Sequence, residues 1–562
     1  MCGIAGIISR NKSVDKNIVE SALNKMLHRG MDDINIYYNG YNVAFGYIRL
    51  AIRGLDNTYS QPIVHNNYIA FGNGEVYNKN GKPINANQCD LLSIISDIPK
   101  KLTKIYDNYD ADFALSIYDK NKNTFFLARD YFGVKPLFYS WIDNDTLAFA
   151  SEIKGLLMLI ERPEYDEKTI MDYLLFGYSL NEKTFYKNVF KLEPRTIFKW
   201  NLNNNKRAFF RADFNIKYRN SQLPIFDYFS IAVKNRLTSD RKISSHLSGG
   251  LDSSLIAYVT TNCLDYYTAF YAKDDFDNQN AGFIAEKLKL NQIKIKLNPN
   301  LKLKDIISIL DCPVMSTGAF VPYQIAMNAH KNNVKVLLAG QGADELFLGY
   351  SRFLNIININ DTNDLFQQLI NSDLNLLCKL FKINIADVFN IYIKNIPETN
   401  CLLFAQKFYI NNFLTSLLHI EDHTHMNFNI ENRVPFLSLP MIKFIKQYGV
   451  CKDGNKMDIK YTHKILNSCA ITNNNLNKKN NMNLKMNEYL KNIDYCIFFE
   501  NKVFDNFDYE FFEKCIHKLD SLTKNELFVI WFVVNLNEWY NCFKFSKKID
   551  LKGWIFNGLF VS

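Results

Sequence analysis

The stretch Ser248-Gly249-Gly250-Leu251-Asp252-Ser253-Ser254 decides the fold of the second half of the chain. It follows residues 243–247, which have the pattern of a strand, and it opens residues 251–261, which have the pattern of a helix. Paired glycines let the backbone approach a ligand closely, and the first turn of a helix offers unpaired N–H groups to an anion. The heptad therefore predicts a phosphate-binding turn, although it is not a Walker A loop, because no GxxxxGK[ST] is present.

Strand-like and helix-like segments alternate on both sides of this turn. Residues 266–271, 292–297 and 334–338 are typical of strands, and residues 281–290 are typical of a helix. This alternation predicts a parallel, doubly wound α/β sheet, and from residue 361 onward the pattern is helical.

A second glycine-rich loop, Gly340-Gln341-Gly342-Ala343-Asp344-Glu345, follows the strand predicted at residues 334–338. Loops at the carboxyl edge of a parallel sheet meet at the ligand. Asp252 and Asp344 are therefore candidates to share a Mg²⁺ ion, which favours carboxylates together with substrate phosphates.

The first 200 residues have a different rhythm, with short apolar segments separated by Gly and Asn turns. Helices are expected at residues 14–27 and 90–105. The pattern predicts an antiparallel α+β unit at residues 1–205, a linker from there to about residue 218, and a second domain at residues 218–562. The strands are expected at residues 34–38, 43–47, 68–71, 114–118, 125–128, 137–139 and 147–150.

The chain opens Met1-Cys2-Gly3-Ile4-Ala5-Gly6. If Met1 is removed, Cys2 carries a thiol and a free α-amine on the same residue. The thiolate is the reactive form, and an amine of near-neutral pKa can take its proton. Cys2 is therefore a candidate N-terminal nucleophile, whereas a cysteine at position two without any role is the alternative.

Bulk composition limits the classes of function. The 562 residues are 48% hydrophobic and 22% charged, with 66 basic and 57 acidic side chains and a net charge of +9. That charge is mild for this length and predicts no nucleic-acid partner. No apolar run is long enough to span a bilayer, and the 11 cysteines lack regular spacing. We therefore expect a cytoplasmic protein with reduced thiols.

Many separate motifs together resemble the glutamine-hydrolysing asparagine synthetase family, over nearly the whole chain. Such enzymes join a class II glutamine amidotransferase domain, of N-terminal-nucleophile hydrolase fold, to a PP-loop ATP pyrophosphatase-type synthetase domain. The matching segments are residues 2–6, 29–32, 49–52, 73–78, 128–139, 149–157, 247–254, 340–345, 349–350, 431–437 and 536–539.

For the first domain, the resemblance implies that Cys2 attacks the glutamine side-chain amide. Asn73 and the Gly74 N–H would form the oxyanion hole. Arg49 would hold the glutamine α-carboxylate, and Glu75 would help to hold the α-amine. The released ammonia would travel inside the protein to the second domain.

For the second domain, the resemblance implies an ATP site with Mg²⁺ on Asp252 and Asp344. An acceptor carboxylate, aspartate in the family, would attack the α-phosphate and release pyrophosphate, and ammonia would then displace AMP. The implied ATP-binding residues are Leu247, Ser248, Gly249, Gly250, Asp252, Ser253, Gly340 and Gln341. The residues implied to bind the acceptor or the intermediate are Gln341, Asp344, Glu345 and His463.

Three of the departures from the family's pattern concern expected binding positions, whereas Ser438 and Arg195 are interpreted as structural drift. Gln88 takes the place of an aspartate that grips the glutamine α-amine, which removes a charge attraction of about 1–2 kcal/mol. Gln341 takes the place of a glutamate near the acceptor. His463 takes the place of a lysine expected near the phosphates, unless Lys460 or Lys464 substitutes for it.

These departures leave alternatives open. The same machinery can serve another carboxylate acceptor, such as a sugar acid, a peptide or a lactam precursor. The chain can also be a stand-alone N-terminal-cysteine amidohydrolase with a degenerate ATP domain, or a binding protein without activity. The resemblance also points to a homodimer, for which the sequence contains no recognisable interface. His419, His423 and His425 lack paired cysteine ligands, so we expect a solvated loop there and no structural zinc.

Overall fold

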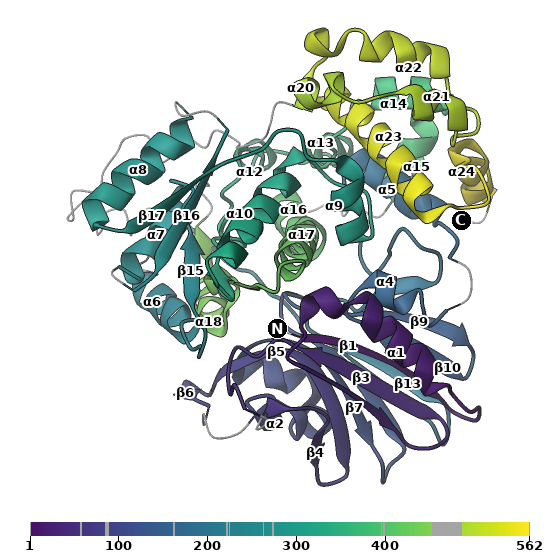
Figure 1. The fold of residues 1–562 in the computed structure, drawn as a ribbon. Coiled ribbons are helices and arrows are strands. Elements are labelled where there is room, and N and C mark those ends of the chain that lie inside the picture. The colour runs from purple at the N-terminus through teal and green to yellow at the C-terminus, as the bar shows by residue number, and fades with distance from the viewer. Residues whose placement is uncertain are drawn as a thin grey trace.

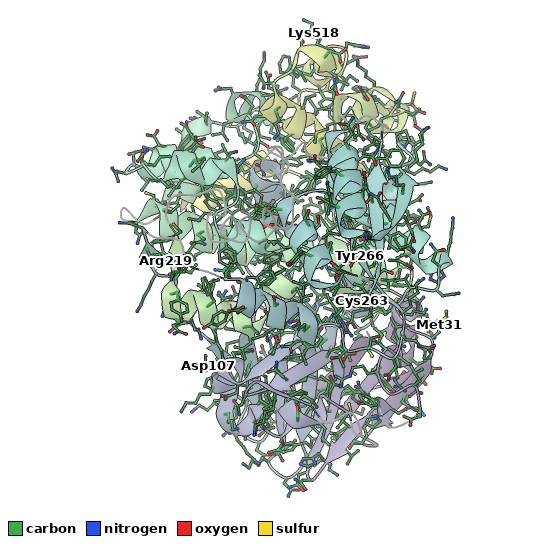
Figure 2. All side chains as sticks on the ribbon, turned by 90° about the vertical axis from the view of Figure 1, so that its left-hand side faces the viewer. Met31, Asp107, Arg219, Cys263, Tyr266 and Lys518 are labelled. Atoms are coloured by element: carbon green, nitrogen blue, oxygen red, sulfur yellow. The ribbon has the colours of Figure 1, made fainter. Side chains whose placement is uncertain are left out.

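The computed structural model describes residues 2–56, 59–84, 89–160, 163–220, 223, 225–261, 263–271, 275–394, 396, 400–451 and 486–560. An N-terminal unit of two sheets lies below a second unit built on a parallel sheet, and helices from the end of the chain (yellow) lie at the upper right, to one side of that sheet (Figure 1). Figure 2 shows the same stacking from the side, with Asp107 on the N-terminal unit and Lys518 at the opposite end of the molecule.

The first sheet of the N-terminal unit has six strands and carries the start of the chain at its centre. Along β1 (Cys2–Ser9), Ile4 and Ile8 face one apolar core while Ala5 and Ile7 face another. This alternation is the period of two that a strand buried on both faces requires. The antiparallel order is β11 (Val189–Lys191), β9 (Phe138–Asp143), β10 (Thr146–Ala150), β1, β3 (Val43–Arg49), β2 (Asp33–Tyr38).

The second sheet packs against the first through aromatic side chains. The ring of Phe45 in the first sheet lies 5.3 Å from that of Phe125 and 6.5 Å from that of Phe71 in the second. This sandwich fixes β5 opposite β1. The order is β13 (Lys206–Arg211), β12 (Thr196–Asn201), β8 (Thr124–Arg129), β7 (Tyr109–Asp119), β5 (Tyr68–Lys79), β4 (Ile63–His65), with β6 (Lys82–Pro83) paired to β5.

Helices cover the outer faces of the sandwich. Helix α1 (Lys16–Lys25) buries Val19, Ala22 and Leu23 against the first sheet. The single helix predicted at residues 90–105 is wrong, because the segment forms α2 (Leu92–Ile95), α3 (Ile98–Lys101) and the 3₁₀ turn η3 (Leu102–Asp107). Pro99 lies in the first turn of α3, and its missing N–H cannot continue a helix from the preceding residues.

The predicted linker also needs correction at its start. Residues 206–211 form β13, which pairs with β12 from Thr196↔Arg211 to Asn201↔Lys206. The side chains of this edge strand are exposed or half-buried, so its sequence lacks the apolar alternation by which a strand is predicted. Beyond it, β14 (Tyr218–Arg219) pairs in parallel with β20 (Val450–Cys451).

The second unit contains the predicted parallel sheet, which confirms the doubly wound α/β prediction. Its order is β17 (Asn291–Lys296), β16 (Asp265–Phe270), β15 (Ile243–His246), β18 (Val336–Leu338), β19 (Glu431–Arg433). The chain runs outward from β15 to β17 and then starts again on the other side with β18, so the switch point lies between β15 and β18. Strand β19 interrupts a region predicted as wholly helical, because its three buried residues include Glu431 and Arg433 and give no apolar run.

Helices flank this sheet and then form the distal part of the molecule. None of the helices in the described ranges is long and apolar enough to cross a membrane. The helices are α4 (Ile153–Leu156), α5 (Glu167–Phe176), α6 (Phe226–Asn235), α7 (Leu251–Val259), α8 (Phe276–Leu288), α9 (Leu303–Leu310), α10 (Phe320–Lys331), α11 (Ala343–Leu346), α12 (Ser351–Ile356), α13 (Thr362–Leu369), α14 (Leu374–Phe381), α15 (Ile385–Ile393), α16 (Cys401–Phe408), α17 (Leu414–Met426), α18 (Leu439–Tyr448), α20 (Met486–Lys491), α21 (Cys496–Asn501), α22 (Tyr509–Ile516), α23 (Lys524–Phe543) and α24 (Leu551–Phe560).

Candidate active sites

Cys2 and Asn73 meet across the two sheets of the N-terminal unit. The backbone nitrogen of Cys2 donates to Oδ1 of Asn73 at 3.1 Å. Asn73 is fully buried on β5, and its Nδ2 has no hydrogen-bond partner within the described part of the chain. An amide group held by one end, with a buried N–H₂ unused at the other, is suited to receive an anionic oxygen beside the thiol.

Gly74 follows Asn73 in a conformation that other residues rarely adopt. Its φ is +145°, and a Cβ there would lie 2.1 Å from the backbone oxygen of Asp112 on the neighbouring strand β7. Only glycine can therefore keep β5 and β7 paired at this point while Asn73 faces Cys2.

Burial has the largest effect on the Cys2 thiol and raises its pKa above the usual value, while the positive charges of the chain's amino terminus and of Arg49 lower it. A buried thiol of this kind needs a nearby base before it can attack.

Arg49 lies directly beside Cys2, because β1 and β3 pair in register at Cys2↔Arg49. Its guanidinium donates to the backbone carbonyl of Asp56 at 2.8 Å and to the carbonyls of Arg53 and Gly54. Gly30 packs against the same strand so closely that a Cβ would lie 2.3 Å from the carbonyl carbon of Arg49. The loop carbonyls thus fix a cation at the end of the nucleophile's strand.

Glu75 lies further along β5 and faces arginines from both units. Its carboxylate is 3.5 Å from Nη1 of Arg53 and 3.9 Å from Nη2 of Arg433, which belongs to β19. Burial and the neighbouring Asp90 raise the pKa of Glu75 to about 8. Its role in binding the glutamine α-amine stays a prediction, and Gln88 lies outside the described residues.

The predicted phosphate-binding turn connects β15 to α7 as expected. Ser248 Oγ and Ser253 Oγ lie 3.0 Å apart, and the Ser248 N–H donates to Ser253 Oγ at 3.1 Å. Gly249 has φ of +80°, and a Cβ there would lie 2.6 Å from the carbonyl oxygen of Asp277 at the start of α8. The turn is therefore closed on itself by serine hydroxyls and needs glycine where it meets α8. Leu247, just before it, is fully buried and donates its N–H to Tyr267.

The second glycine-rich loop touches the first at the switch point of the sheet. A Cβ on Gly340 would lie 2.9 Å from Cβ of Asp252, so the two loops are in direct contact. Asp252 and Asp344 are 7% and 8% exposed, while Glu345 is buried and accepts a hydrogen bond from the Tyr350 hydroxyl. The site residues predicted on the two loops therefore gather where open α/β sheets bind their ligands. His463 lies outside the described residues, as do Lys460 and Lys464.

Arg29 joins the nucleophile's strand to the second unit, a contact that the sequence did not predict. The fully buried guanidinium donates from Nε to the Cys2 carbonyl at 3.1 Å and from Nη1 to Glu152 at 2.7 Å. It also makes a two-pronged bond to Asp422 on α17, at 2.7 and 3.1 Å. One side chain thus ties the position of Cys2 to a helix of the other unit.

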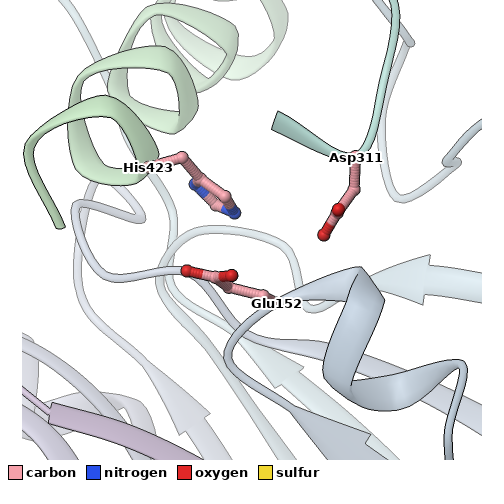
Figure 3. Close-up of side chains that lie close together, drawn as sticks. All are labelled: Glu152, Asp311 and His423. Carbon is pink, nitrogen blue, oxygen red and sulfur yellow. The ribbon is translucent and has the colours of Figure 1, made fainter. Parts of the chain in front are cut away.

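Glu152, Asp311 and His423 lie together beside this contact (Figure 3). Their ligand atoms are all within 4.8 Å of one another, as in a metal site. However, Lys154 Nζ is 3.0 Å from Glu152 and 3.3 Å from Asp311, so a lysine ammonium already bridges the two carboxylates. We interpret the cluster as part of the charged network between the units.

The prediction of a solvated loop at the three histidines is wrong. His419, His423 and His425 belong to α17, and the side chains of His423 and His425 are at most 1% exposed. Burial lowers the pKa of all three, to about 4 for His419 and His425. Neutral imidazoles can be buried by bonding to backbone carbonyls, and His423 Nδ1 lies 2.9 Å from the His419 oxygen.

The sequence analysis also missed Glu421, which contacts a predicted site residue. Its Oε1 accepts a hydrogen bond from Nε2 of Gln341 at 2.8 Å, although the two residues are 80 positions apart. No local motif marks Glu421, and the motif at residues 29–32 does not identify the partners of Arg29. The one signal for Glu421 in the sequence is that Gln341 replaces a glutamate of the family. The charge lost at position 341 can be supplied by another acidic side chain.

Comparison with known proteins agrees with both units. Residues 1–211 match the family model of the glutamine amidotransferase domain, and residues 225–448 match the model of asparagine synthase. The chain is 29% identical over 378 residues to "Asparagine synthetase [glutamine-hydrolyzing] 1" of Bacillus subtilis, which covers 62% of this chain and 59% of that protein. It is 27% identical over 530 residues to "Asparagine synthetase [glutamine-hydrolyzing] 2" of the same organism, covering 84% of this chain and 70% of that protein. The two domains in this order place the chain in the glutamine-hydrolysing asparagine synthetase family, whose enzymes are carbon–nitrogen ligases.

Proposed function

We propose that the protein is a glutamine-dependent asparagine synthetase. It hydrolyses glutamine to glutamate and ammonia, converts aspartate and ATP to an aspartyl adenylate and pyrophosphate, and transfers the ammonia to form asparagine and AMP. The observation that carries the proposal is that Arg29 forms hydrogen bonds to both Cys2 and Asp422. This contact joins the unit that contains the nucleophile to the unit that contains the phosphate-binding turn.

In the first reaction Cys2 is the nucleophile, once Met1 has been removed. Its sulfur attacks the carbon of the glutamine side-chain amide, and its own α-amine takes the thiol proton and passes it to the departing ammonia. Water then hydrolyses the resulting thioester, which releases glutamate and restores the thiol. Asn73 Nδ2 and the Gly74 N–H receive the charge that develops on the amide oxygen. Arg49 holds the glutamine α-carboxylate with a charge-assisted bond.

In the second reaction the two loops at the switch point bind ATP. Ser248, Gly249, Gly250 and Ser253 hold the phosphates with N–H and hydroxyl donors at the start of α7. The acceptor carboxylate attacks the α-phosphate, and pyrophosphate leaves. Asp252 and Asp344 fit a hard cation, because both are carboxylates on loops in contact, and a Mg²⁺ held there would offset the phosphate charge.

The experiment is a pyrophosphate-release screen over carboxylates, run with glutamine and separately with ammonium. We expect aspartate to stimulate pyrophosphate release with both nitrogen donors, with AMP as the nucleotide product. Formation of ADP would contradict the proposal, and so would a failure of every carboxylate to release pyrophosphate.

A second candidate keeps this chemistry and changes the acceptor to another carboxylate, such as a sugar acid or a peptide. The observation that favours it is the pairing of Gln341 with Glu421, which places a carboxylate at an unexpected point beside the acceptor loop. In the same screen, this candidate predicts that aspartate has no effect while another carboxylate stimulates pyrophosphate release.

A further inference from the structure

Glu421 is a buried carboxylate held by two neutral amides. It lies on α17 with 6% of its surface exposed. Its Oε1 accepts from Nε2 of Gln341 at 2.8 Å, and its Oε2 accepts from Nδ2 of Asn432 on β19. A carboxylate has about four lone-pair positions, so each oxygen keeps room for another donor.

The charges around Glu421 do not balance it. Buried carboxylates are normally paired with a cation, yet no lysine or arginine of the described ranges forms an ion pair with Glu421. The charged neighbour that acts on it is Glu345 of α11, which is also an acid. His425 donates from Nδ1 to the Glu421 backbone oxygen at 2.7 Å, and its other nitrogen lies 3.2 Å from His246.

These histidines do not supply the missing charge. Burial lowers the pKa of His246 to about 3 and that of His425 to about 4, so both rings are neutral at physiological pH. Asp344 and Glu345, which follow Gln341 on the same loop, add only negative charge. Within the described part of the chain, Glu421 is therefore an acceptor that lacks a positively charged partner, next to the loop assigned to the acceptor substrate.

We propose that Glu421 accepts the proton that ammonia loses when the amide forms, with Gln341 holding its carboxylate in place. This inference rests on the proposed function. The nitrogen lone pair bonds to the acyl carbon of the adenylate, and one N–H proton moves to Glu421. The acyl C–O bond to the phosphate then breaks, and its electron pair leaves with AMP. Glu421 afterwards returns the proton to solvent.

The side chain at position 341 explains why another residue is needed to accept the proton. The side-chain amide of Gln341 donates a hydrogen bond but cannot take a proton at neutral pH. Glu421 accepts that hydrogen bond, so the basic group lies on α17, next to Gln341, and not on the loop itself. Burial, with a smaller contribution from Glu345, raises the pKa of Glu421 to about 7, close to the value that favours proton transfer at neutral pH.

The test compares Glu421→Gln with the wild type in three separate reactions of the full-length protein. These are glutamine hydrolysis, ATP–pyrophosphate exchange with the acceptor carboxylate, and amide formation from ammonium. We expect amide formation to fall by about 10²- to 10⁴-fold, while the other two rates change by less than about threefold. At a constant concentration of free ammonia, the wild-type rate should rise with pH through about 7, and the variant should lose that rise. Glu286→Gln, the same change at an exposed position on α8, is the matched control and should behave as wild type.

A charge relocation separates a chemical role from a structural one. Adding Gln341→Glu to Glu421→Gln exchanges the two side chains of this hydrogen bond. The carboxylate then lies at position 341 and the amide at position 421. We expect this double variant to recover amide formation at least about tenfold over Glu421→Gln. Wild-type amide formation in Glu421→Gln, or an equal loss in all three reactions, would overturn the role of Glu421. If instead the wild type forms no amide from any carboxylate, the proposed function itself is wrong.

Discussion

The side-chain oxygen of Asn73 accepts a hydrogen bond from the backbone nitrogen of Cys2 at 3.1 Å, across the two sheets of the N-terminal unit. The contact fixes the orientation of the Asn73 amide, because the oxygen end is used and the nitrogen end is left for another acceptor. That nitrogen is buried and has no partner in the described ranges. A substrate oxygen that becomes negative beside Cys2 would satisfy it.

Asn73→Ala should therefore slow glutamine hydrolysis by about 10²- to 10³-fold in kcat, because one preorganised donor to the developing charge is lost. Ammonium-dependent synthesis should stay unchanged, since it bypasses Cys2. Steady-state glutaminase and ammonium assays on the same preparation measure both. An equal loss in the two assays would show that Asn73 matters for folding and not for the oxyanion.

Arg49→Met should raise KM for glutamine by about 10- to 100-fold, because a charge-assisted bond to the α-carboxylate is worth about 1.5–3 kcal/mol. The value of kcat should change less, since Arg49 is expected to bind the substrate without contacting the reacting amide. Glutaminase assays over a range of glutamine concentrations give the two constants. A fall in kcat at unchanged KM would contradict this assignment.

Arg29→Met should destabilise the protein by about 3–5 kcal/mol, because Glu152 and Asp422 would lose a buried cation. Urea unfolding followed by fluorescence measures the change. Lys12→Met is the matched control, since Lys12 pairs with Asp143 at the surface and its loss should have little effect. Equal stabilities of Arg29→Met and Lys12→Met would show that the two units do not depend on this contact.

Glu421→Gln should make stability less dependent on pH. Burial raises the pKa of Glu421 from its ordinary 4.5 to about 7, so the folded protein holds a proton there that the unfolded chain has lost. Stability of the wild type therefore falls as pH rises from about 4.5 to about 7, and the variant lacks this contribution. Unfolding at pH 5 and pH 8 tests the difference. A larger pH dependence in the variant would contradict the direction of this shift.

Much of the candidate site is predictable from sequence where its residues lie in short motifs. The family resemblance points to Asn73 and Gly74 on β5 through one motif, and the serine-glycine pattern predicts the turn between β15 and α7. These motifs are local, because a turn and the strand or helix beside it are contiguous in sequence. The fold was also predictable where apolar periodicity is strong, as in the parallel strands β15 to β18.

The remaining features depend on contacts between distant residues. Arg29 and Asp422 are separated by 393 positions, and neither lies in a pattern that identifies a partner. Glu421 lies in no motif, and the three histidines predict a solvated loop, because polar residues usually face solvent, whereas α17 is packed on several sides. Pro99 was the one local signal that was misjudged, since it ends the helix predicted across it.

The central claim is that Cys2 releases nitrogen from glutamine for transfer to a carboxylate in the same protein. The most direct measurement supplies amide-¹⁵N-labelled glutamine, aspartate and ATP, and follows ¹⁵N into the product amide by mass spectrometry. We predict labelled asparagine from the wild type and from the control Cys263→Ala, which changes an exposed cysteine. Cys2→Ala should give no labelled product from glutamine, yet should still form asparagine from ammonium. Equal labelling by Cys2→Ala and the wild type would contradict the account.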